Sequence, residues 1–304
     1  MLLVTPLAVP VTCWDLRPGQ SLAAHLAGTA SAPGRPTYTI DYGRIRFADR
    51  AMGFEDWVAR IIPAAVRAVS EAHGGADVHL VGWSHGGTLS LLTAAYDAEL
   101  PIASITALGT PTDYRLNPVY APVFWCHERL GWHPLFIGTT IFGGTTERGT
   151  RLGYRWMSPS REVTKPWMLL TNLHKPEVLA RISATDRFIA SMPGYPGRFF
   201  HQSTATLVAG RALAEGTVRF TDDVVVEMAN LAAPTLLIAS SADVLANPAS
   251  VEAGVEAYPN AEVTFHKVKG LSHLGLIASP KASDLTWPLI DRHLSAYDRV
   301  DVGS

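Results

Sequence analysis

The sequence predicts an α/β protein in which a mostly parallel sheet of about six strands is covered by helices on both faces. Short apolar runs alternate along the chain with longer, alanine-rich stretches of helical periodicity. The apolar runs lack strict polar alternation, as expected of parallel strands that are buried on both faces. Strands that alternate with helices favour a parallel sheet over an antiparallel one.

Each element follows from one of these stretches. We expect strands at 2–4, 37–42, 78–82, 104–109, 234–240 and 262–268, and helices at 21–27, 54–73 and 88–100. The chain has 304 residues, of which 47% are hydrophobic, so it can bury a large core.

Residues 118–216 interrupt this rhythm. They are rich in Trp, Tyr, Phe, Gly and Pro and contain no clean strand–helix unit. Long insertions in compact domains are often lids, so we predict a cap over an active site; an ordinary excursion of the chain is the alternative. The predicted core is then 1–117 together with 217–300, and 301–304 form a tail.

Charge, cysteine content and hydropathy limit which partners and which cellular location we expect. The net charge is −2, and no basic face or polybasic patch is indicated, so nucleic acid is not expected as a partner. The two cysteines, Cys13 and Cys126, are too few for a disulfide framework and suggest reduced thiols in the cytoplasm. The apolar start lacks a basic segment and a cleavage site, and no run of ~18 uncharged apolar residues predicts a transmembrane helix.

The strongest catalytic signal is the pattern Gly82-Trp83-Ser84-His85-Gly86, which follows an expected strand and begins a helix. In a nucleophile elbow the serine occupies a tight strand-to-helix turn, and glycine on each side lets neighbouring backbone approach without a Cβ clash. The helix N-terminus presents free N–H groups to a developing oxyanion. We therefore predict that Ser84 is a nucleophile; the alternative is a glycine-rich turn with an incidental serine.

A serine nucleophile needs a histidine base and an acid that orients it. In the α/β-hydrolase fold these follow the nucleophile in the order acid, then histidine. Asp243 comes just after the expected strand 234–240, at the carboxyl end where sites on open α/β sheets gather. His273 lies in the loop after the last strand. We therefore predict an α/β-hydrolase fold in which His273 Nδ1 faces Asp243 and Nε2 faces Ser84.

Other residues compete for these roles. Asp113 also follows a core strand and is the alternative acid, while Asp243 could instead be a loop cap. His266 lies inside the last strand, which favours a structural role. Cys126, beside His127, is an alternative nucleophile without a strand–turn–helix setting, and an unreactive cysteine is the simpler interpretation.

The oxyanion is expected to be held by backbone N–H groups. His85 begins the helix after the nucleophile, so its N–H is the natural donor, while its side chain should point away from the Ser84 hydroxyl. The second donor should come from the loop after the first strand, where we favour Leu7. The histidines are scattered without paired ligand spacing, so we predict neither a metal nor an organic cofactor.

Several stretches of the chain resemble the polyhydroxyalkanoate synthases. They are Trp14–Leu22, in which Asp-Leu-Arg-Pro is the most specific part, Met52–Trp57, the elbow with Gly86–Leu89, Thr110–Tyr114, and, in the insertion, Met192–Gly194 and Phe199–His201. The resemblance spans most of the chain in patches. It implies an α/β-hydrolase-fold acyltransferase that polymerises hydroxyacyl-CoA through a covalent acyl-enzyme, with the insertion as its cap.

The chain departs from that family at three places. The family has a cysteine in the elbow, where this chain has Ser84, and typically a histidine directly after the acid, where this chain has Val244. The resemblance also implies that the chain begins at the third strand of the fold. Either the sheet is trimmed to about six parallel strands, or the start of the sequence is incomplete.

The serine favours hydrolysis over polymerisation. A thiol is partly ionised near neutral pH and exchanges readily with thioesters, which suits repeated chain transfer, whereas serine depends on its base. We predict a hydrolase that cleaves an ester or thioester of a small-molecule acyl or hydroxyacyl substrate, acyl-CoA included, and the aromatic insertion suggests a medium or long acyl group. Acyl transfer of the polyhydroxyalkanoate synthase type is the alternative. A non-catalytic scaffold of hydrolase fold is the third, disfavoured by the intact order of serine, acid and histidine.

Overall fold

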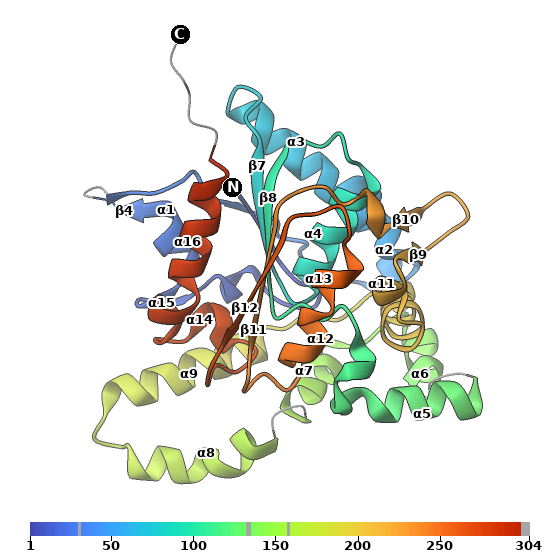
Figure 1. Cartoon of the computed structure of the whole chain (residues 1–304). Helices are drawn as coiled ribbons and strands as arrows, with labels where there is room; N and C mark the ends of the chain where they lie inside the picture. The colour runs from blue at the N-terminus through green and yellow to red at the C-terminus, as the bar shows by residue number, and fades with distance from the viewer. Residues whose placement is uncertain (30–31, 132–134, 157–158, 299–304) are drawn as a thin grey trace.

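A six-stranded sheet runs through the centre of the protein (Figure 1). The computed structural model describes residues 1–304 apart from 30–31, 132–134, 157–158 and 299–304. In spatial order the strands are β12 (Val263–Val268), β11 (Thr235–Ser240), β8 (Ile102–Leu108), β7 (Val78–Trp83), β1 (Leu2–Val4) and β6 (Tyr38–Thr39). Every neighbouring pair is parallel, so the predicted sheet is confirmed.

The sheet separates two apolar cores. Leu80 of β7 and Leu237 of β11 belong to one core, whereas the adjacent Val81 and Ile238 belong to the other. Because successive side chains of a strand point to opposite faces, a strand buried on both faces needs apolar residues at nearly every position. This explains why the sequence shows apolar runs rather than alternation.

Helices cover both faces of the sheet (Figure 1). One face carries α1 (Leu22–Ala27), α14 (Gly275–Ala278), α15 (Ala282–Leu285) and α16 (Trp287–Ala296). The other carries α2 (Phe54–Asp56), the π-helix η3 (Trp57–Ile61), α3 (Ile62–Ala72), α4 (His85–Tyr96), α12 (Pro248–Glu252) and α13 (Gly254–Ala257). The helix expected at 88–100 thus begins three residues earlier, directly after Ser84, and ends at Tyr96.

Short elements connect these layers. Within the part of the chain that the structure describes, antiparallel pairs are formed by β2 (Asp15–Arg17) with β3 (Gln20–Ser21), β4 (Gly28–Thr29) with β5 (Ala32–Pro33), and β9 (Thr217–Arg219) with β10 (Val225–Glu227). The 3-10 helices are η1 (Val11–Cys13), η2 (Phe47–Ala51), η4 (Tyr114–Leu116), η5 (Pro118–Tyr120) and η7 (Met228–Asn230). Among the described helices, none combines the length and apolar character needed to span a bilayer.

The segment 118–216 is mainly helical where the structure describes it. Its longer elements are α5 (Ala121–Leu130), α6 (Leu135–Phe142), α7 (Glu147–Trp156), α8 (Pro159–Thr171), α9 (Pro176–Ala190), α10 (Gly197–Gln202), the π-helix η6 (Ser203–Ala209) and α11 (Ala212–Glu215). Helices α5 to α9 lie beyond the carboxyl ends of the strands (Figure 1). The loops that contain Ser84, Asp243 and His273 leave the sheet at this same end.

Candidate active site

Ser84 occupies a strained turn between β7 and α4. Its backbone has φ 55° and ψ −127°, a conformation that residues other than glycine rarely adopt. Its N–H donates to the Leu108 carbonyl at 2.8 Å, which fixes the turn on the neighbouring strand β8. Such strain is characteristic of functional turns that the surrounding structure holds in place. The sharp strand-to-helix turn expected from the sequence is therefore present at Ser84.

The glycines on each side of Ser84 are required by close backbone contacts. A Cβ added at Gly82 would lie 2.5 Å from the backbone of Gly86 and Gly87. A Cβ added at Gly86 would collide with the carbonyl oxygen of Val4, at the end of β1. The loop that follows β1 is therefore packed directly against the elbow.

Asp243 and His273 form a buried pair. The Oδ2 atom of Asp243 lies 2.7 Å from Nδ1 of His273, and their side chains are 0% and 8% exposed. The other carboxylate oxygen, Oδ1, accepts hydrogen bonds from the N–H groups of Leu245 at 2.9 Å and Ala246 at 3.0 Å. With both oxygens held, the carboxylate can fix the orientation of the imidazole ring.

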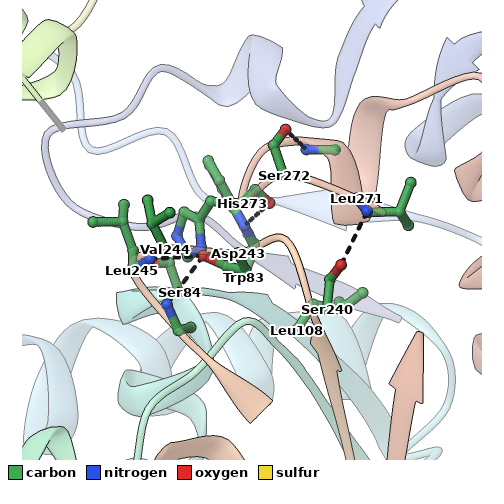
Figure 2. Close-up of polar contacts among 12 residues, drawn as sticks. Trp83, Ser84, Leu108, Ser240, Asp243, Val244, Leu245, Leu271, Ser272 and His273 are labelled. Atoms are coloured by element: carbon green, nitrogen blue, oxygen red, sulfur yellow. Dashed lines mark hydrogen bonds and ion pairs between the residues drawn. The ribbon is translucent and has the colours of Figure 1, made fainter. Parts of the chain in front are cut away.

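The second ring nitrogen of His273 is free. Its Nε2 atom is buried and has no hydrogen-bond partner among the described residues. Ser84 lies beside the Asp243–His273 pair (Figure 2). Among the described residues, however, His273 Nε2 makes no hydrogen bond to Ser84 Oγ. The structure therefore brings the predicted acid and histidine into direct contact and places the serine next to them.

Two further residues position this pair. Trp83 is fully buried, and its indole N–H donates to the His273 carbonyl at 3.1 Å (Figure 2). Gly109 has φ +56°, and a Cβ added there would lie 3.1 Å from both Asp243 Oδ2 and His273 Cε1. Neither role is among those predicted from the sequence. Their signals were the place of Trp83 inside the elbow pattern and of a glycine directly after β8.

Asp113, the alternative acid, has another partner. Its carboxylate receives two hydrogen bonds from the Arg211 guanidinium, at 3.1 and 2.6 Å. Burial alone would raise the pKa of Asp113, but the hydrogen bonds from Arg211 and from the Arg115 N–H, with the charges of both arginines, hold that pKa below its ordinary value. Asp113 therefore joins β8 to the end of the insertion, and it is Asp243 that contacts His273.

Asn117 and Tyr120, on either side of the start of the insertion, are hydrogen-bonded to the loop that carries Asp243. The Asn117 side-chain amide donates to the carbonyls of Val244 at 3.1 Å and Leu245 at 3.0 Å. The Tyr120 hydroxyl donates to the same Leu245 carbonyl at 3.0 Å. The N–H groups of the same two peptides, those of Leu245 and Ala246, both donate to Asp243 Oδ1, so these bonds act on the carboxylate through two peptide units.

The two proposed oxyanion donors lie on the two segments that meet at the elbow. His85 is the first residue of α4, and Leu7 is in the loop after β1 that packs against Gly86. Neither backbone N–H donates a hydrogen bond within the described chain. Both N–H groups can therefore donate a hydrogen bond to an oxyanion without breaking an existing one.

The His85 side chain contacts the insertion. Its Nε2 lies 3.1 Å from Ser203 Oγ, and its ring meets those of Phe54, Tyr195 and Phe199 edge-on at centroid distances of 6.3, 6.1 and 6.0 Å. Burial, with a smaller effect of the nearby His273, lowers the His85 pKa to about 4. The imidazole is therefore neutral at pH 7 and surrounded by aromatic rings.

The rival candidates lie elsewhere. Cys126 is half-buried on α5, and His266 is an exposed residue of strand β12. Neither one shares a hydrogen bond with Ser84, Asp243 or His273 within the described residues. The geometry therefore favours the serine over the cysteine.

The chain is similar in sequence to a known family and to individual proteins. The family model described as alpha/beta hydrolase fold matches residues 22–280. The poly(3-hydroxyalkanoate) polymerase subunit PhaC of Haloferax mediterranei is 23% identical over 279 residues, which are 91% of this chain and 54% of that protein. The subunit of the same name from Allochromatium vinosum is 24% identical over 270 residues, covering 87% of this chain and 72% of that protein. The chain thus spans about half the length of the Haloferax relative.

A solved structure shares the overall architecture. An epoxide hydrolase from Bacillus megaterium superposes with a TM-score of 0.56 at 15% identity, covering 97% of this chain and 93% of that one. At this identity the likeness concerns the fold.

Proposed function

The chain belongs to the alpha/beta hydrolase fold family, and on this premise we propose that it cleaves an ester or thioester of an acyl substrate through an acyl-enzyme on Ser84. The observation that carries the proposal is the 2.7 Å contact between Asp243 Oδ2 and His273 Nδ1. It leaves His273 Nε2, which has no partner among the described residues, free to act as a base. This nitrogen lies on the residue oriented by Asp243, next to Ser84, so it is available to accept the Ser84 proton (Figure 2).

In the first half-reaction Ser84 Oγ attacks the substrate carbonyl carbon, and its proton passes to His273 Nε2. Asp243 stabilises the resulting imidazolium, and the N–H groups of His85 and Leu7 bind the oxyanion. The tetrahedral intermediate then collapses, and the alcohol or thiol leaves with the proton from His273. The acyl group is now bonded to Ser84.

In the second half-reaction water takes the place of the alcohol or thiol. His273 accepts a proton from the water as it attacks the acyl carbon. Collapse of the second intermediate releases the acid, and the proton returns to the Ser84 oxygen. The missing hydrogen bond between Ser84 and His273 is compatible with this sequence, since such bonds are often long without substrate and tighten when it binds.

The aromatic surroundings of His85 support an acyl chain as the substrate group. Tyr195 and Phe199 of the insertion stack at 5.9 Å and contact the first residue of α4. An apolar chain bound beside Ser84 would gain from such rings, because burial of each CH₂ contributes ~0.8 kcal/mol. Rates on p-nitrophenyl esters and acyl-CoA thioesters of increasing chain length test this preference.

Acyl transfer to an acceptor other than water is the second candidate, and the similarity to PhaC polymerase subunits favours it. The serine is the counter-observation, because it lacks the ready thioester exchange of a thiolate. Incubation with 3-hydroxybutyryl-CoA separates the two candidates. Free 3-hydroxybutyrate as the sole product supports hydrolysis, and oligomers support transfer.

A fluorophosphonate probe tests the role of Ser84 directly. The probe should label the wild-type protein, and Ser84→Ala should abolish the labelling. The exposed Ser283→Ala provides a matched control that should label as the wild type does. Undiminished labelling of Ser84→Ala would refute the assignment of the nucleophile.

A further inference from the structure

We propose that the outer side of helix α8 is a docking surface for an anionic lipid surface. This α8 face consists of Val163, Trp167 and Leu170 of the helix and Leu173 in the turn that follows it, whose side chains are 78%, 70%, 65% and 67% exposed. Large apolar side chains that gather on a surface mark interaction sites. The inference goes beyond the proposed hydrolysis and does not depend on Ser84.

The spacing of these residues puts them on one side of the helix. Val163, Trp167 and Leu170 are separated by four and three positions, so they share one face of α8. Lys165 points to the opposite side and pairs with Asp186 of α9 at 2.7 Å. In Figure 1, α9 lies between α8 and the helices that cover the sheet. The α8 face is therefore directed away from the rest of the protein.

Surplus positive charge accompanies this apolar stripe. Residues 147–175 contain six Lys and Arg but two Asp and Glu, whereas the whole chain has a net charge of −2. Helix α7 directly precedes α8 and contacts it, and its Arg148 and Arg155 are exposed, as is Lys175 just after α8. These three have no ion pair within the described residues. Without a negatively charged partner, only ions from the solvent would compensate their charge.

A segment that combines an apolar stripe of Trp and Leu with unpaired Lys and Arg has the composition of segments that lie in the interface of an anionic bilayer. Each cation near such a surface contributes ~1 kcal/mol of attraction, and the apolar side chains enter the headgroup region. The segment lacks the length to cross the membrane, so the contact is peripheral.

Charge argues against a second copy of this chain as the occupant. Two α8 faces brought together would also bring together two sets of surplus cations, and like charges across an interface disfavour association. A lipid surface supplies both the apolar phase and the opposite charge. The solution molecular mass tests the alternative.

Vesicle sedimentation tests the proposal. The full chain should sediment with phosphatidylcholine vesicles that contain phosphatidylglycerol, and much less with phosphatidylcholine alone. The double variant Trp167→Ser, Leu170→Ser should lose binding by ~10-fold or more, because its apolar anchor is gone. The double variant Arg155→Glu, Lys175→Glu should lose the dependence on phosphatidylglycerol.

Three controls keep the outcome interpretable. Val255→Ser, an exposed apolar residue of α13, should bind as the wild type does. Circular dichroism and hydrolysis of a soluble p-nitrophenyl ester should be unchanged in the Trp167→Ser, Leu170→Ser variant. Ser84→Ala should bind vesicles fully, so failure of the hydrolase proposal and failure of this one are distinguishable.

Two results would overturn the proposal: a wild-type protein that does not bind phosphatidylglycerol vesicles, and a Trp167→Ser, Leu170→Ser variant that binds them as well as the wild type does. If the wild type does not bind vesicles but forms a dimer that this variant converts to a monomer, the α8 face joins two copies of the chain.

Discussion

The indole N–H of Trp83 donates a hydrogen bond to the backbone oxygen of His273 at 3.1 Å, and the two rings lie 5.0 Å apart. Trp83 is the residue before the proposed nucleophile in the chain, and His273 is the proposed base. The turn that strains Ser84 therefore also supports the loop that carries the histidine. A displacement of either element changes the geometry between nucleophile and base.

Trp83→Phe should lower kcat while the protein stays folded. Phenylalanine keeps an aromatic ring but loses the hydrogen bond, and misplacement of the His273 loop should cost ~10-fold or more in kcat. Loss of the bond should lower the free energy of unfolding by ~1 kcal/mol in addition to the effect of the smaller ring. Ester hydrolysis and urea unfolding measure the two effects.

Trp57→Phe provides the matched control. Trp57 is also fully buried, but its indole N–H has no hydrogen-bond partner among the described residues. The variant should therefore lose ring volume without losing a hydrogen bond, and its kcat should stay near the wild-type value. An equal fall in kcat in both variants would argue that packing, not the bond to His273, controls the rate.

Asp243→Asn should reduce kcat by ~10⁴-fold without unfolding the protein, because an amide can hold His273 in the wrong tautomer. Asp113→Asn is the comparison, since Asp113 pairs with Arg211 instead. That variant should retain most of the kcat and lose stability. A larger loss of kcat in Asp113→Asn than in Asp243→Asn would reverse the assignment of the acid.

The sequence could predict the elbow and the order of acid and histidine because both are local or topological. Parallel strands end at one edge of the sheet, so residues just after β7, β11 and β12 had to lie near each other. It could not decide between Asp243 and Asp113, because both follow core strands. The choice depends on Arg211, which lies 98 residues after Asp113 and contacts it only in the folded chain.

Other contacts between distant segments could not be predicted from the sequence either, because they form only in the folded chain. The bonds from Asn117 and Tyr120 to Val244 and Leu245 join residues more than a hundred positions apart. They are made to backbone carbonyls, so nothing in the types of Val244 and Leu245 indicates them. The structure alone links the start of the insertion to the loop of Asp243.

Tyr120→Phe should lower kcat by several-fold with little change in KM. The variant removes the hydroxyl that donates to the Leu245 carbonyl at 3.0 Å, and the N–H of that same peptide, which belongs to Ala246, donates to Asp243 Oδ1 at 3.0 Å. The loss of one bond should also cost ~1 kcal/mol of stability. Steady-state kinetics on a p-nitrophenyl ester and urea unfolding report both quantities.

Tyr258→Phe is a suitable reference for Tyr120→Phe. The Tyr258 hydroxyl is buried and lies 2.9 Å from Thr112 Oγ1, away from the loop of Asp243. The variant should lose a similar amount of stability but keep its kcat. If both variants lower kcat alike, the effect reflects general destabilisation and Tyr120 has no positioning role.

His85 should make the folded state sensitive to acid. Burial, helped by His273, lowers its pKa from 6.5 to about 4. Between these values the unfolded chain binds a proton that the folded chain does not, so unfolding becomes easier as pH falls. The stabilisation is complete above pH 6.5 and is lost as pH falls through this window.

His85→Gln should therefore lose less stability than the wild type between pH 7 and 4.5. Glutamine can keep a hydrogen bond to Ser203 but does not titrate. Urea unfolding at a series of pH values measures the slope, with the exposed His174→Gln as the control. Identical slopes in His85→Gln and the wild type would show that His85 titrates normally in the folded protein.

Gly109→Ala should impair both stability and catalysis, and its control separates the two causes. The new Cβ would lie 2.9 Å from Leu276 Cδ1 and 3.1 Å from Asp243 Oδ2 and His273 Cε1, so the acid–histidine pair must shift. Misplacement of this size costs up to ~10²-fold in rate.

Gly74→Ala is the control for backbone strain, because Gly74 has a similar φ of +67° but a Cβ added there would meet nothing within 4 Å. It should lose ~1 kcal/mol of stability from backbone strain alone and keep its kcat. Because both variants carry the same strain, a fall in kcat confined to Gly109→Ala assigns the effect to contact with the Asp243–His273 pair; equal kcat values would show that this pair tolerates the methyl group.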